Sequence, residues 1–185
     1  MSMAADPPDQ LLDREPWLRG PLFGVHPYVA PTLHAYAQAR EDLARWTEGL
    51  TDAQIWSRPH GIAPAGFHLR HIAGSVERLT TYLRGEQLTR QQLEAVAHEM
   101  DPGPGRLALL TEVNTALENS ERIIRSLDSS TLADPRTVGR KHFPATVIGL
   151  VVHLAEHTQR HVGEFIVTVK LSRDAQTGRT RPLPS

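Results

Sequence analysis

The sequence predicts an all-α protein, a four-helix bundle with short helices in its connections. Four long stretches repeat apolar residues at three- and four-residue steps, and two shorter stretches begin with helix-capping signals. No stretch shows the strict alternation of apolar and polar residues, bounded by turn signals, that is typical of hairpin strands. Helices that each carry one apolar face bury those faces against one another. We therefore expect a bundle without a sheet.

The first two long helices and both short ones follow from local signals. Apolar residues recur at helical spacing from Thr32 onward, which predicts the first long helix. A second long helix is expected over about 65 to 84, where Gly85 follows as a stop signal. Thr51 and Thr89 are each followed three residues later by Gln, the spacing of a capping box, so each should open a short helix.

The third and fourth long helices lie in the C-terminal half. The Pro- and Gly-rich stretch 101–105 interrupts helical structure, and the helix after it is expected to end near Asp128. A polar loop is expected over 129–143. Pro144 is suited to the first position of the last helix, whose apolar spacing continues through Val169 for about 40 Å.

Length and composition fit one globular domain. The chain has 185 residues, 39% hydrophobic and 22% charged, which suffices for a hydrophobic core. We place this domain at 31–172, between an extended proline-bearing N-terminal arm (1–30) and a polar C-terminal tail (173–185). The 20 Lys and Arg against 21 Asp and Glu disfavour a nucleic-acid partner, and the longest apolar run is too short to cross a membrane. Without a targeting signal, we expect a cytoplasmic protein.

Histidine is the unusual feature of the composition. Ten of the 185 residues are histidine, and five of them fall in the segments 67–71 and 153–161, while cysteine is absent. The lack of cysteine excludes disulfides, thiolate ligands and cysteine nucleophiles. On a helix, four side chains of the second region share one stripe about 80° wide: His153, His157, His161 and Glu164.

His157 and His161 are the strongest metal-ligand candidates, because they lie nearest the apolar face. Two histidines at i and i+4 can offer two nitrogens to one cation. The third ligand must come from a facing helix, where either His71 or His68 borders the apolar stripe. Three histidines with open coordination positions are typical of a catalytic site, since structural sites usually close all four positions with protein ligands. For His153 alone, a hydrogen-bonded structural role is the commoner explanation.

Glu164 has three candidate roles. It can be a further ligand, a general base, or the acceptor for the ring N–H of a ligating histidine, and we favour the last. His153 and His68 join it as candidates for supporting the ligands or transferring protons. An anionic substrate is one candidate ligand for the basic residues, but solvated surface is the commoner explanation for them; they are Arg136, Arg140, Lys141 and Arg160.

Two sequence motifs carry a family resemblance. Residues 71–79 (HIAGSVERL) place a His before a hydrophobic residue, a small residue and a run that ends in Arg-Leu, and residues 157–164 (HTQRHVGE) are similar to H-x-x-x-H-x-G-Q. Over about 31–171 the chain resembles the DinB-like (damage-inducible) superfamily of metalloenzymes, which are four-helix bundles. The resemblance implies His71, His157 and His161 as metal ligands. Glu164 departs from it, because the family usually has Gln there.

The resemblance also implies a class of function. Some relatives transfer low-molecular-weight thiols such as bacillithiol or mycothiol, or use them to isomerise small acids, and others are described as hydrolases. Our first hypothesis is therefore a metal-dependent enzyme for thiol transfer or thiol-dependent isomerisation of a small molecule, and a metal-dependent hydrolase is the near alternative. A non-enzymatic metal-binding helical module and a purely structural bundle are the other classes. The metal is expected to be divalent (zinc, nickel, iron or manganese), and the resemblance implies a homodimer.

Overall fold

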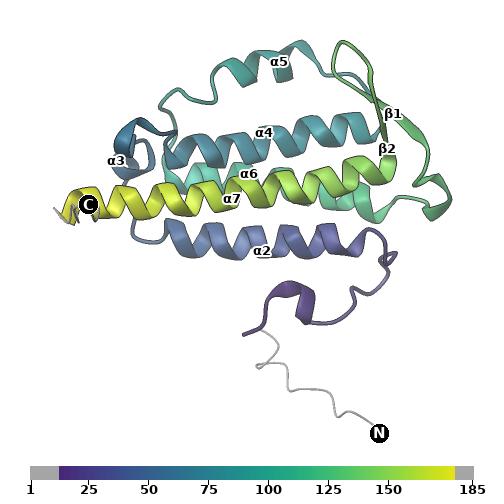
Figure 1. The fold of residues 1–185 in the computed structure, drawn as a ribbon, viewed down its shortest axis with the longest axis horizontal. Coiled ribbons are helices and arrows are strands. Elements are labelled where there is room, and N and C mark those ends of the chain that lie inside the picture. The colour runs from purple at the N-terminus through teal and green to yellow at the C-terminus, as the bar shows by residue number, and fades with distance from the viewer. Residues whose placement is uncertain (1–12, 178–185) are drawn as a thin grey trace, which may run out of the picture.

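The computed structural model of the chain describes residues 13–177 and confirms the four-helix bundle (Figure 1). The long helices are α2 (Ala30–Thr47), α4 (Ala65–Leu83), α6 (Arg106–Arg125) and α7 (Val147–Thr177). The short elements are η1 (Pro16–Leu18), α3 (Asp52–Ile55), η2 (Pro59–Gly61), α5 (Arg90–Ala97) and η3 (Ser129–Thr131). Helix α4 packs against both α6 and α7, and α2 packs mainly against α7. α7 continues beyond 172, into the stretch assigned to the polar tail.

Both predicted capping boxes are present. The Thr51 hydroxyl accepts a hydrogen bond from the backbone N–H of Gln54 at 3.3 Å, and the Gln54 side chain accepts one from the backbone N–H of Thr51 at 2.8 Å. The Thr89 and Gln92 pair repeats this exchange at 3.2 and 2.9 Å. These reciprocal bonds satisfy backbone donors that would otherwise lack partners, and they start α3 and α5.

The segment before α7 differs from the sequence prediction. Strand β1 (Pro135–Val138) pairs antiparallel with β2 (Phe143–Thr146), so the expectation of no sheet was wrong for these residues. Pro144 therefore lies within β2 rather than at the first position of α7. Both strands of a two-stranded ribbon are edge strands, which tolerate a proline that cannot donate a hydrogen bond. Four-residue strands are also too short to display a clear alternation.

The third long helix ends earlier than expected. It stops at Arg125 instead of near Asp128. The Asp128 carboxylate accepts a hydrogen bond of 2.9 Å from the backbone N–H of Ser130 and so caps η3. An aspartate that bonds to the backbone ahead of it favours a turn over continuation of a helix.

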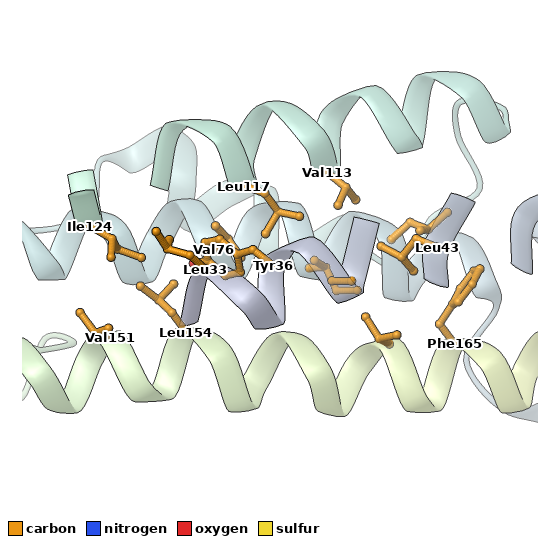
Figure 2. Close-up of a cluster of buried hydrophobic side chains, with 14 of the residues drawn as sticks. Leu33, Tyr36, Leu43, Val76, Val113, Leu117, Ile124, Val151, Leu154 and Phe165 are labelled. Carbon is orange, nitrogen blue, oxygen red and sulfur yellow. The ribbon is translucent and has the colours of Figure 1, made fainter. Parts of the chain in front are cut away.

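The core lies between the four long helices, and each contributes buried side chains (Figure 2). The labelled ones are Leu33, Tyr36, Leu43, Val76, Val113, Leu117, Ile124, Val151, Leu154 and Phe165. Burying one such aliphatic side chain stabilises the fold by about 1.5–3 kcal/mol. Within the described residues, none of the helices combines the length and apolarity that a membrane span requires.

Candidate metal centre

Two neighbouring helices bring the histidines together. α4 and α7 lie side by side and run in opposite directions (Figure 1). His68 and His71 lie in the first two turns of α4, and His157 and His161 lie near the middle of α7. Side chains at i and i+3 or i+4 share one helix face, so each helix presents its own pair.

His71, His157 and His161 form a cluster that can bind a metal ion. One nitrogen from each ring lies within 4.8 Å of the other two. The Nε2 atoms of His71 and His157 are 3.1 Å apart, and the His161 ring centroid lies 4.3 Å from that of His71 and 4.7 Å from that of His157. Two nitrogens bound to one cation at about 2.1 Å are separated by about 3.0–3.4 Å at ordinary coordination angles. The distance between the two Nε2 atoms already fits this range.

Glu99, which the sequence motifs did not single out, supports this cluster. It follows α5 and is only 4% exposed. Its Oε2 lies 2.6 Å from Nδ1 of His71, and its Oε1 lies 2.8 Å from Nη1 of Arg78 in an ion pair. Burial alone would raise the pKa of Glu99, but the hydrogen bond from His71 and the charge of Arg78 outweigh it and leave that pKa below its ordinary value. The ionised carboxylate only accepts, so His71 donates through Nδ1 and keeps the lone pair of Nε2.

His68 and Glu164 lie beside His161. The carboxylate Oε2 of Glu164 is 3.0 Å from Nδ1 of His161 and 3.5 Å from Nδ1 of His68. The two Nδ1 atoms are 3.4 Å apart, one of them donating to the other. His68 is 5% exposed, whereas the side chain of Glu164 is 50% exposed. Together with His161, these residues make a second group of potential metal ligands.

His153 occupies a different position. Its Nδ1 lies 2.5 Å from Oε1 of Glu156, and that carboxylate also pairs with Arg160 at 2.6 Å. Although the His153 ring centroid is 5.3 Å from that of His157, His153 belongs to neither ligand group found among the described residues. Its contacts match the hydrogen-bonded structural role that we favoured for it.

The comparison with known families agrees with the geometry. A family model of the DinB superfamily matches residues 35–165, which include all three clustered histidines. The chain belongs to the DinB superfamily. No curated protein matches it. Membership of the DinB superfamily accounts for the four-helix bundle.

The surroundings of His68, His157 and His161 in this DinB protein favour their neutral forms at pH 7. Burial lowers the pKa of His157 to about 4, helped by the neighbouring His161 and His71. The pKa of His68 is also lowered to about 4, mainly by burial. Burial and the nearby His71 lower the pKa of His161. A metal binds only the unprotonated nitrogen, so these shifts leave lone pairs free to bind a cation at neutral pH.

One aromatic ring covers the cluster. Phe67 stacks on His71 with ring centroids 5.3 Å apart and planes inclined by 24°. It also meets the ring of His161 edge-on at 6.5 Å. These contacts restrict the rotation of the two imidazoles and add apolar surface beside their nitrogens.

Proposed function

We propose that this DinB protein is a metal-dependent enzyme whose divalent ion is held by His71, His157 and His161. The observation that carries the proposal is the position of His71. Its Nε2 lies 3.1 Å from Nε2 of His157 while its Nδ1 bonds to Glu99. A buried carboxylate that holds the second nitrogen of an imidazole is the arrangement that orients metal-ligating histidines in proteins.

The chemistry of the donor atoms narrows the choice of metal ion. Imidazole nitrogens suit zinc, nickel and iron, whereas manganese prefers oxygen ligands. Bound to three histidines, such an ion keeps coordination positions open and lowers the pKa of a bound thiol or water. The chain's own contribution is to fix the ligands: Glu99 orients His71, and Glu164 is placed to accept the ring proton of His161.

For the reaction, we propose transfer of a low-molecular-weight thiol to a small molecule, or isomerisation that uses such a thiol. In the transfer, the thiol would lose its proton to solvent, its sulfur would form a bond to an electrophilic carbon, and the leaving group would depart from that carbon with the bonding electrons. The family resemblance supports this choice, and the absence of cysteine is compatible with it, because the mechanism needs no thiol from the chain. We also propose, on the resemblance alone, that the protein forms a homodimer.

The first experiment is elemental analysis of protein purified without a His-tag or a nickel column. The unaltered chain should contain stoichiometric metal, and His157→Ala and His161→Ala should each lose the equivalent held by the three histidines, while circular dichroism shows retained helical content. Metal content that is unaffected by both substitutions would contradict the proposed site.

The second experiment addresses the reaction. The metal-loaded protein is screened with low-molecular-weight thiols and electrophilic acceptors, and the product is detected by mass spectrometry. Thiol-dependent product formation is expected. Turnover of an ester or amide without added thiol would instead identify a hydrolase, and a loaded protein that is inactive in both screens would favour the metal-binding module.

A further inference from the structure

The second ligand group lies beside the first and shares His161 with it. His68 precedes His71 by one turn on α4, and Glu164 follows His161 by one turn on α7. The two helices run in opposite directions (Figure 1), and His68 and Glu164 lie 3.5 Å apart, from Nδ1 to Oε2. The proposed metal centre uses neither of these side chains as a ligand.

The three donor atoms of this group form a triangle of suitable size. Its edges are 3.4 Å between the Nδ1 atoms of His68 and His161, 3.5 Å from His68 Nδ1 to Glu164 Oε2, and 3.0 Å from His161 Nδ1 to Glu164 Oε2. Ligands at about 2.0–2.1 Å from a tetrahedral cation lie about 3.3 Å apart. The triangle therefore matches one face of a tetrahedral site without movement of any side chain.

We propose that His68, His161 and Glu164 bind a second divalent transition-metal ion, such as zinc. His161 would then ligate through both ring nitrogens, with Nδ1 in this site and Nε2 in the site of His71 and His157. The role of Nε2 rests on the proposed function. When the second ion binds, the N–H bond at Nδ1 of His161 breaks, its proton passes to solvent, and a nitrogen–metal bond forms in its place.

Charge and access support the second ion. The carboxylate of Glu164 carries one negative charge, and the deprotonated imidazole of His161 carries another that it shares with the first ion, so together they offset part of the charge of the second ion. A buried ion without such compensation would be costly. Half of the Glu164 side chain is exposed, so the cation can reach the site from solvent. His68, at 5% exposure, closes the opposite side.

The test is a zinc titration of the metal-free 185-residue chain. Calorimetry monitors the titration, and elemental analysis after desalting counts the bound zinc. Two equivalents are expected for the unaltered protein. Glu164→Gln, which keeps the size of a half-exposed side chain, should bind one, and so should His68→Asn. His71→Ala should lose the other equivalent, and His161→Ala should lose both. The matched control, His153→Asn, should keep two, because His153 lies one turn from His157 but outside both groups.

The variants separate this proposal from the proposed function. A single equivalent in the unaltered chain, or two equivalents retained by Glu164→Gln, would overturn the second site and leave the first untouched. Two equivalents retained by His71→Ala would overturn the proposed function as well. Repeating the titration in buffers of different ionisation enthalpy should show one additional proton released with the second zinc, and its absence would contradict the shared imidazole.

Discussion

Glu99 accepts a hydrogen bond of 2.6 Å from Nδ1 of His71, although 28 residues separate the two in sequence. The contact joins the turn after α5 to the first half of α4. Arg78, seven residues further along α4, holds the other oxygen of the same carboxylate at 2.8 Å. The chain therefore fixes the ring of His71 through a buried ion pair rather than through packing alone.

Replacing Glu99 should weaken metal binding without unfolding the bundle. In Glu99→Gln the amide can still contact His71, but it no longer carries the charge that keeps Nδ1 protonated and balances Arg78. Loss of such a supporting contact typically reduces metal affinity about 10- to 100-fold. Competition with a chelator of known affinity measures the change.

The control for this prediction is Glu156→Gln. Glu156 also pairs with a histidine and an arginine, His153 and Arg160, but on the exposed surface of α7. Glu156→Gln should leave the zinc affinity within about twofold of that of the unaltered protein, because exposed ion pairs contribute little. Equal affinities for Glu99→Gln and the unaltered protein would show that the Glu99 contact does not orient a ligand.

Two neighbouring histidines on α7 should differ sharply in how much each contributes to metal binding. His157→Ala should lose the metal equivalent that the three clustered imidazoles hold, since one of them disappears. His153→Ala, one turn earlier on the same helix, should retain it, because that ring bonds to Glu156 instead. Elemental analysis of the two variants side by side checks the prediction, and similar metal losses in both would contradict the ligand assignment.

The helices and the α7 histidine pair were predictable because they depend on local spacing. A 3.6-residue period fixes which side chains share a helix face, so His157 and His161 could be paired from sequence. The capping boxes at Thr51 and Thr89 are likewise local. The register between two helices is not local, and the residues alone left His71 and His68 as open alternatives. The structure places them on either side of His161, in separate ligand groups.

Features that depend on long-range contact or on very short elements were not predictable. Glu99 lies between a short helix and the Pro- and Gly-rich stretch 101–105, and no periodicity in the sequence links it to His71. The β1–β2 hairpin was missed because each strand has only four residues and one contains Pro144. A proline is a strong local signal for a helix start, and pairing with Thr137 across the ribbon outweighed it.

A core substitution tests how much the packing between the helices contributes to the stability of the bundle. Leu117→Ala on α6 removes a fully buried side chain and should lower the free energy of unfolding by about 2–5 kcal/mol. Leu107→Ala on the same helix should change it by less than about 0.5 kcal/mol, since Leu107 is 69% exposed. Urea unfolding of both variants measures the difference, and equal effects would contradict the burial assigned to Leu117.

The metal-free protein should lose stability as the pH falls from about 6.5 to about 4. His68 and His157 have ordinary pKa values near 6.5 in the unfolded chain and values of about 4 in the folded one. Between these limits the unfolded state binds more protons, so the free energy of unfolding decreases with each step toward lower pH. Above pH 6.5 these two groups contribute no pH dependence. Urea midpoints at pH 7.5, 5.5 and 4 measure the trend.

Removing one of these histidines should flatten that pH dependence. In His157→Gln the titrating ring is absent, so the decrease in stability between pH 6.5 and 4 should become smaller, while the midpoint at pH 7.5 changes little. The same lowered pKa also means that protons compete with a metal for His157 only as the pH approaches 4, well below the range in which a free imidazole is protonated. Zinc bound at pH 5.5 would agree with this order, whereas release already at pH 6.5 would show that the imidazole nitrogens are as basic as in water.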